Sequence, residues 1–84
     1  MVIIYSASWC APCRYTKKLL NNKKIKYKEI DIEKADISRQ DLEKITGGST
    51  IPQIIINDKC IGGFDQLLIL EQSGALNKLV WLQN

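Results

Sequence analysis

The sequence contains no histidine and only three cysteines, and both shortages narrow the chemistry that it can perform. A closed zinc site needs four ligands, which are commonly cysteine and histidine. Two neighbouring thiols, a distant third and no histidine do not supply such a set, so we expect no metal. An odd number of cysteines also argues against the framework of structural disulfides that is typical of small secreted proteins.

Long apolar runs are missing as well. No segment approaches the roughly 20 apolar residues that a membrane-spanning helix needs. The apolar start at Met1–Tyr5 is too short for a signal peptide and lacks a basic leader. We therefore expect no membrane partner and a cytoplasmic location. The 84 residues, 45% of them hydrophobic, predict one domain over residues 1–84.

Charge of one sign is also scarce. The net charge is only +3, and the lysines between Lys17 and Lys28 are followed at once by the acidic residues Glu29 and Asp31. We interpret these lysines as a solvated face and expect no nucleic-acid partner.

Apolar and β-branched runs alternate with helix signals in the order β-α-β-α-β-β-α. The predicted strands are 2–6, 25–32, 53–57 and 60–62. The predicted helices are 12–22, 39–46 with Asp36 or Ser38 as cap, a third that starts at the cap Asp65 and runs through Leu70 until Gly74 breaks it, and a short final helix over 75–82. A crossover helix makes the first two strands parallel, and the tight turn at 57–59 makes the last two antiparallel. This α/β arrangement, a mixed four-stranded sheet flanked by helices, is the thioredoxin-type fold.

The segment Cys10-Ala11-Pro12-Cys13 follows the first predicted strand and opens the first predicted helix. Thiol–disulfide exchange needs a thiolate, a second thiol within reach and an open approach. At a helix N-terminus the unpaired N–H groups and the dipole favour a thiolate, and such cysteines titrate at roughly 3.5 to 7.5 instead of about 8.5. We therefore predict that Cys10 attacks a disulfide and that Cys13, one turn below and more buried, resolves the mixed disulfide.

The neighbours of this segment carry further expectations. Pro12 stiffens the turn. Trp9 places a ring beside Cys10, as a packing aromatic, as a shield against solvent, or as both. Arg14 stabilises the thiolate, meets a substrate anion, or faces solvent. The third thiol, Cys60, is expected to be a small buried hydrophobe, with a regulatory surface thiol as the alternative.

With these residues placed, the chain resembles the glutaredoxins over nearly its full length. The motifs that carry the resemblance are Ile4-Tyr5 before the Cys-x-x-Cys turn, Arg39 to Gly47, Ser49-Thr50-Ile51-Pro52-Gln53, Ile61-Gly62-Gly63-Phe64-Asp65 and the tail around Gly74-Ala75-Leu76. The resemblance implies a dithiol oxidoreductase with glutathione as reductant and substrate. It also implies a cis peptide bond before Pro52, which turns the backbone of Ile51 toward Cys10.

The resemblance assigns glutathione contacts to six residues: Arg39, Ile51, Pro52, Gly63, Phe64 and Asp65. The backbone of Ile51 would pair with the cysteinyl unit. Asp65 would meet the amino group, and Arg39 the glycyl carboxylate. Their alternative roles are a helix cap for Asp65 and an ordinary surface residue for Arg39.

The chain also departs from the family pattern. Trp-Cys-x-Pro-Cys is typical of thioredoxins, and Ala7, Pro12 and Gln66 replace a lysine, a tyrosine and a second aspartate that are common in glutaredoxins. Phage-encoded members of the family mix the two motifs in a similar way. The departures keep a thioredoxin-like reductase, recharged by a flavoprotein reductase, as an alternative function. A non-catalytic binding module or iron–sulfur carrier is a further alternative. The intact cysteine pair argues against it, and Pro12 argues against a cluster because it stiffens the turn that a cluster must approach.

The resemblance further implies disulfide-containing proteins as partners, with ribonucleotide reductase as a target that the family suggests. We expect the chain to be a monomer.

Overall fold

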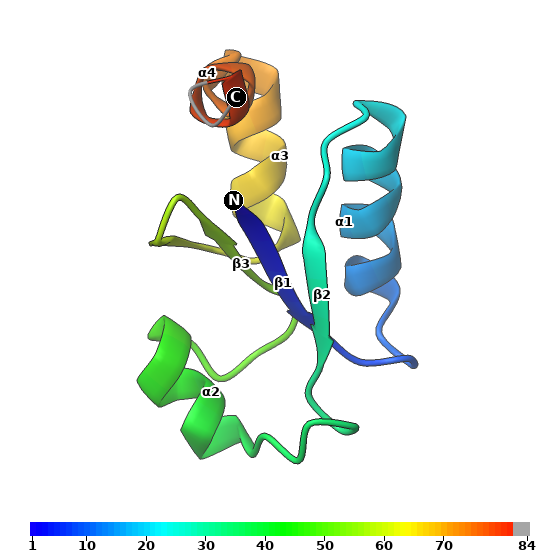
Figure 1. Ribbon diagram of the computed structural model, residues 1–84, viewed down its shortest axis with the longest axis vertical. Helices are drawn as coiled ribbons and strands as arrows, with labels where there is room; N and C mark the ends of the chain where they lie inside the picture. The colour runs from blue at the N-terminus through cyan, green and yellow to red at the C-terminus, as the bar shows by residue number, and fades with distance from the viewer. Residues whose placement is uncertain (82–84) are drawn as a thin grey trace.

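Four short strands form one mixed sheet in the order β2-β1-β3-β4, seen in the computed structural model, which describes residues 1–81 (Figure 1). The elements are β1 Val2–Ser6, α1 Ala11–Asn22, β2 Lys28–Asp31, α2 Arg39–Thr46, β3 Gln53–Ile56, β4 Lys59–Gly62, α3 Phe64–Ser73 and α4 Ala75–Trp81. β1 pairs with β2 in parallel and with β3 antiparallel, and β3 pairs antiparallel with β4. The predicted thioredoxin-type fold is confirmed.

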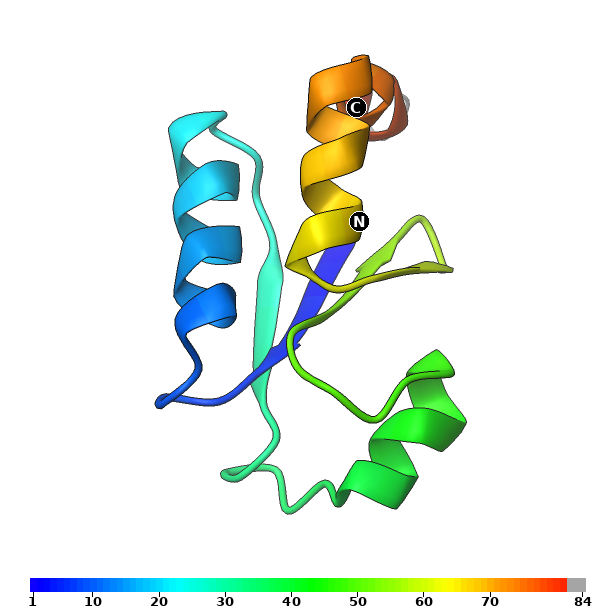
Figure 2. The ribbon, with the colours of Figure 1, turned by 180° about the vertical axis from the view of Figure 1, so that it is seen from behind.

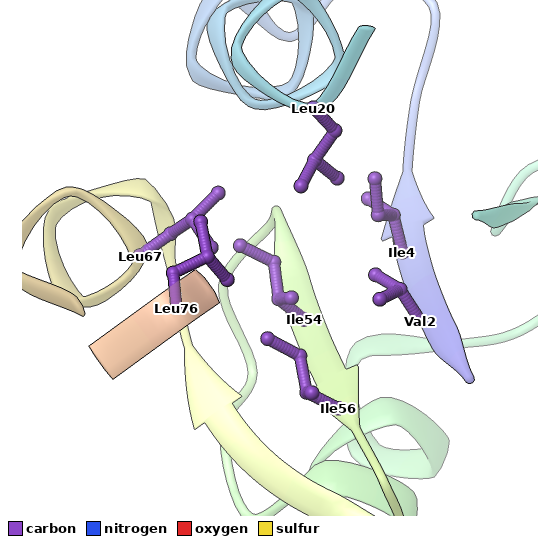
Figure 3. Packing of buried hydrophobic residues seen from close by; sticks show 7 residues of the cluster. All are labelled: Val2, Ile4, Leu20, Ile54, Ile56, Leu67 and Leu76. Atoms are coloured by element: carbon purple, nitrogen blue, oxygen red, sulfur yellow. The ribbon is translucent and has the colours of Figure 1, made fainter. Parts of the chain in front are cut away.

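The side chains of β1 alternate between two apolar layers, because successive residues of a strand point to opposite faces. Val2 and Ile4 lie in one buried cluster with residues of β3, α1, α3 and α4, and the members drawn in Figure 3 are Val2, Ile4, Leu20, Ile54, Ile56, Leu67 and Leu76. Tyr5 packs on the other face with Leu42 of α2. Helices α1, α3 and α4 therefore cover one face of the sheet, and α2 covers the other, apart from them in both views (Figures 1 and 2).

The second helix begins and ends as its sequence predicts. Ser38 is the N-cap of α2: its hydroxyl accepts from the Asp41 N–H at 3.0 Å, and the Asp41 carboxylate accepts from the Ser38 N–H at 3.3 Å. Gly47 ends the helix with φ +85°, a left-handed conformation that glycine adopts without a steric penalty. Of the two predicted caps, Ser38 is the right one.

Several predicted boundaries differ from the structure by one residue, and two predicted starts differ for a physical reason. β2 begins at Lys28 instead of Ile25, because Lys24 has φ +59° and the Ile25 N–H donates to the Leu20 carbonyl, so the chain is still leaving α1 there. α3 begins at Phe64 with Gly63 as its N-cap instead of Asp65, because the Gln66 side chain accepts the Gly63 N–H at 2.9 Å. Leu82, the predicted end of the last helix, lies outside the described residues.

Over residues 1–81, none of the helices has the length and apolar character needed to cross a membrane.

Candidate active site

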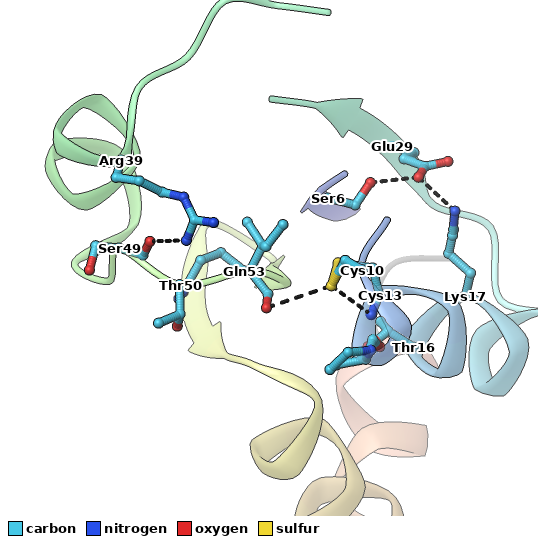
Figure 4. Close-up of a disulfide and its surroundings, with 12 residues drawn as sticks. Ser6, Cys10, Cys13, Thr16, Lys17, Glu29, Arg39, Ser49, Thr50 and Gln53 are labelled. Carbon is cyan, nitrogen blue, oxygen red and sulfur yellow. Dashed lines mark hydrogen bonds and ion pairs between the residues drawn. A yellow bond between two sulfur atoms is a disulfide. The ribbon is translucent and has the colours of Figure 1, made fainter. Parts of the chain in front are cut away.

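The two cysteines of the motif are joined by a disulfide at the entry of α1. Cys10 is the N-cap residue of this helix, and the Cys13 N–H donates to Cys10 Sγ at 3.2 Å (Figure 4). Cys13 is fully buried and Cys10 is 4% exposed. The sulfur of Cys10 therefore lies where an N–H group at the positive end of a helix can stabilise a thiolate.

The loop before β3 brings a backbone edge to this sulfur. Cys10 Sγ lies 3.8 Å from the carbonyl oxygen of Ile51, and the Ile51–Pro52 peptide bond is cis, as expected. The predicted approach of the Ile51 backbone to Cys10 is thus observed.

A groove runs beside this loop between α1 and α3. It is lined by Pro12, Tyr15, Thr50, Ile51, Pro52, Gly63, Phe64, Asp65 and Gln66. The structure therefore brings together, at one surface, five of the six residues to which glutathione contacts were assigned, with Pro12 beside them. Gly62, just before the groove residue Gly63, has φ +113°, which side chains disfavour, and a Cβ there would lie 3.2 Å from the Gln66 side chain.

The sixth residue, Arg39, lies at the start of α2. Its guanidinium carbon is 5.9 Å from the centroid of the Trp9 ring. Its Nη1 donates to the Ser49 carbonyl at 2.8 Å (Figure 4). Trp9 is 58% exposed, so it does not pack in the core. Of the interpretations of Trp9, the packing aromatic is therefore wrong, because its ring lies at the surface against a cation.

Sequence reasoning missed two features of this region. Tyr15 lines the groove and contacts the Phe64 ring at 5.9 Å between centroids. Its position three residues after Pro12, on the same face of a helix, was a usable signal. The second feature is Glu29 of β2, which accepts from Ser6 Oγ at 2.6 Å and from Lys17 Nζ at 2.8 Å.

These contacts lower the pKa of Glu29 below the usual 4.5. The Lys17 hydrogen bond is the largest cause, the Ser6 hydrogen bond adds to it, and burial opposes both. The carboxylate thereby ties the ends of β1 and β2 to α1, the helix that begins at the cysteine pair (Figure 4).

Two other predicted residues lie elsewhere. Arg14 is on the exposed side of α1 and is not among the residues that line the groove. Cys60 is exposed, with its Sγ 3.9 Å from the Ile45 carbonyl, so the expectation of a buried cysteine is wrong. The reason is that β4 lies at the edge of the sheet, with β3 on one side of it.

Among residues 1–81, there is no group of three or more histidine, cysteine, aspartate or glutamate side chains able to hold a metal ion.

Comparison with known proteins agrees with this geometry. The family model of the glutaredoxins matches residues 2–61. A glutaredoxin of Pseudomonas aeruginosa is 37% identical over 79 residues, which cover 94% of both chains. Glutaredoxin 3 of Escherichia coli K12 is 35% identical over 79 residues, covering 94% of this chain and 95% of that protein.

The fold has the same relatives. The crystal structure of a buckwheat glutaredoxin–glutathione complex superposes with a TM-score of 0.86 at 27% identity, covering 94% of this chain and 74% of that one. The family assignment agrees with two features of the site. These are the bonded Cys10–Cys13 pair at the start of a helix and the Ile51–Pro52 loop beside it. The chain belongs to the glutaredoxin family and is a thiol–disulfide oxidoreductase.

Proposed function

We propose that this chain reduces glutathione mixed disulfides and protein disulfides with glutathione as the electron donor. The observation that carries the proposal is the groove beside the cysteine pair, where the backbone of Ile51 and the carboxylate of Asp65 line one surface. Glutathione offers a peptide backbone, an ammonium group and a glycyl carboxylate. A backbone edge, an acidic side chain and the nearby cation of Arg39 are complementary to these three groups.

With a glutathione mixed disulfide, the Cys10 thiolate attacks the glutathionyl sulfur. A Cys10–glutathione disulfide forms, and the substrate leaves as a thiolate that takes up a proton. A second glutathione thiolate then attacks the glutathionyl sulfur, which releases oxidised glutathione and restores the Cys10 thiolate. The Cys13 N–H at the Cys10 sulfur supports this assignment, because it favours Cys10 both as attacking group and as leaving group.

With a protein disulfide, Cys10 forms a mixed disulfide with one sulfur of the target. The Cys13 thiolate then attacks Cys10 Sγ, which releases the reduced target and leaves the Cys10–Cys13 disulfide. Two molecules of glutathione reduce this bond and leave as one molecule of oxidised glutathione. The bonded pair at the start of α1 supports this second half of the cycle.

Substitution of each cysteine separates the two roles. Cys10→Ser should abolish reduction of both substrate types, because the attacking sulfur is gone. Cys13→Ser should keep turnover of glutathione mixed disulfides and lose reduction of protein disulfides. Both activities are measured with purified protein, glutathione and a coupled glutathione reductase assay.

Two results would contradict these roles. The first is an equal loss in both variants on both substrates. The second is activity on glutathione mixed disulfides that survives Cys10→Ser but not Cys13→Ser.

A second electron donor is favoured by one specific observation. Ala7 stands where many glutaredoxins have a lysine. It is 3% exposed and packs with Tyr5 and Leu42, so this position offers no cation to glutathione. A thioredoxin-like cycle would instead take electrons from a flavoprotein reductase. Incubating the oxidised chain with glutathione or with a thioredoxin reductase, and following the Cys10–Cys13 bond by thiol alkylation and mass spectrometry, distinguishes the two donors.

The proposal includes a monomer that acts in the cytoplasm on disulfide-containing proteins, of which ribonucleotide reductase is a candidate. Sedimentation at micromolar concentration checks the monomer. Visible absorption after anaerobic purification would favour the iron–sulfur carrier instead.

A further inference from the structure

We propose that Trp9 is a positioning residue that holds Arg39 for the glycyl carboxylate of glutathione. This inference rests on the proposed function. Trp9 would act on substrate binding through Arg39, and it would not act on the sulfur chemistry itself. The Trp9–Arg39 pair would thus supply, from a different place in the fold, the cation that position 7 lacks.

The side chains of Arg39 and Trp9 are in contact. The Arg39 guanidinium carbon lies 5.9 Å from the centroid of the Trp9 ring, within the range of a cation–π interaction. Arginine side chains lose considerable rotamer freedom when they are fixed. A ring on one side and the Ser49 carbonyl on the other, 2.8 Å from Nη1, restrict the guanidinium before any ligand arrives.

The contact between Trp9 and Arg39 lies beside the cysteine pair. Trp9 immediately precedes Cys10, Arg39 is the first residue of α2, and Ser49 belongs to the loop that leads to Ile51. Three segments that are distant in sequence therefore meet at one side of the cysteine pair. The groove lined by Phe64 lies on the α3 side of the same loop.

The guanidinium of Arg39 keeps a positive charge that is available to a ligand. A guanidinium carries five N–H donors, and the Ser49 carbonyl takes up one of them. A ring face attracts the cation without accepting a conventional hydrogen bond. Among residues 1–81, two carboxylates form ion pairs, Glu29 with Lys17 and Glu71 with Lys23, and none lies within 4.0 Å of the Arg39 guanidinium. The positive charge of Arg39 is therefore held in place but not neutralised.

More than half of Trp9 is exposed to solvent. An indole ring that is 58% exposed buries little apolar area against the protein, so core packing does not account for its position. Its contact with Arg39 does account for it. A ring of similar shape should preserve this contact, and an aliphatic side chain should not.

The test compares two substrates that differ in one charge. One is a small glutathione mixed disulfide, and the other is the same compound with its glycyl carboxylate esterified. Trp9→Leu should raise KM for the natural substrate about two- to five-fold with little change in kcat, and should leave KM for the ester unchanged. Trp9→Phe should retain most of the wild-type affinity.

A double substitution completes the cycle. Arg39→Met should remove the preference of the protein for the natural substrate over the ester. Adding Trp9→Leu to Arg39→Met should then change KM no further. Independent effects of the two substitutions would overturn the inference.

Other outcomes separate this inference from the proposed function. If Trp9→Leu raises KM equally for both substrates, or for neither, Trp9 does not act through Arg39. If the wild-type protein favours glutathione mixed disulfides but does not distinguish the ester, the glycyl carboxylate does not bind Arg39, and only the positioning role fails. If it turns over a neutral small disulfide as well as a glutathione mixed disulfide, the proposed function fails.

Discussion

Glu29 is a single side chain that joins three elements, and its carboxylate accepts from Lys17 at 2.8 Å and from Ser6 at 2.6 Å. Since the pKa of Glu29 is lower in the folded protein than the usual 4.5, the carboxylate stabilises the fold at any pH above that value. This stabilisation is lost as the pH falls below 4.5 and through the pKa of the folded state.

We predict from this that Glu29→Gln destabilises the protein at pH 7 and that the difference from the wild type shrinks below pH 4.5. Urea unfolding at a series of pH values measures it. Glu33→Gln, which removes the same charge from an exposed position, is the matched control. A difference between Glu29→Gln and the wild type that stays constant between pH 7 and pH 3 would contradict the prediction.

At the scale of single residues, the sequence alone was enough to identify those that belong to a recognisable motif. Cys10 and Cys13 were singled out by their spacing, and Pro52 and Asp65 by the resemblance to the glutaredoxins. Glu29 was not found, because a strand glutamate beside lysines reads as an ordinary solvated charge. Its contact with Ser6 spans 23 positions and exists only once β1 and β2 are paired.

The β3–β4 turn is the element whose role extends furthest beyond its own residues. Asn57 has φ +53°, its N–H donates to the Met1 carbonyl at 3.0 Å, and its Nδ2 donates to the Leu79 carbonyl of α4 at 3.0 Å. One turn residue thus ties the hairpin to β1 and to the last helix.

We predict that Asn57→Gly lowers the free energy of unfolding by about 1 kcal/mol more than Asp58→Gly does. Both substitutions place glycine at a positive φ, +53° and +67°, so the backbone change is the same in kind. The excess reports the side-chain contacts of Asn57. Urea denaturation of the two variants measures it, and equal losses would show that the contact with α4 contributes nothing to stability.

The errors in the predicted elements are of one kind. Ile25 and Tyr27 read as strand residues, yet they pack on the core from a loop, because Lys24 turns the chain with a positive φ. Asp65 reads as a helix cap, yet it is the side chain of Gln66, the third residue of α3, that accepts the N–H of the N-cap residue Gly63. A pattern of apolar residues indicates what is buried, whereas the hydrogen bonds that end an element depend on neighbours that the pattern does not contain.

The whole molecule depends on a small core, since a folded chain of 84 residues buries a limited fraction of its surface. Leu67 is fully buried where α3 meets the sheet, and Ile69, two residues later on the same helix, is 63% exposed. The layers were predictable because short apolar runs alternate with helix signals along the chain. The exposure of Cys60 was not, because it depends on the place of its strand at the edge of the sheet.

We predict that Leu67→Ala lowers the free energy of unfolding by about 2–5 kcal/mol, a large part of the roughly 4–13 kcal/mol expected for 84 residues. Ile69→Ala should change it by no more than about 0.5 kcal/mol. Thermal unfolding followed by circular dichroism compares the two. Similar losses in both variants would mean that α3 does not dock through Leu67.

The exposed position of Cys60 makes the oxidised protein easy to modify at one chosen point. With Cys10 and Cys13 bonded to each other, Cys60 is the one thiol of three that an alkylating reagent can take. Cys60 lines a shallow cleft of its own, which shares Thr50, Gly63 and Gln66 with the groove beside Pro12. A fluorophore attached before reduction would stand next to that groove and report its occupation, while both active-site sulfurs stay unlabelled.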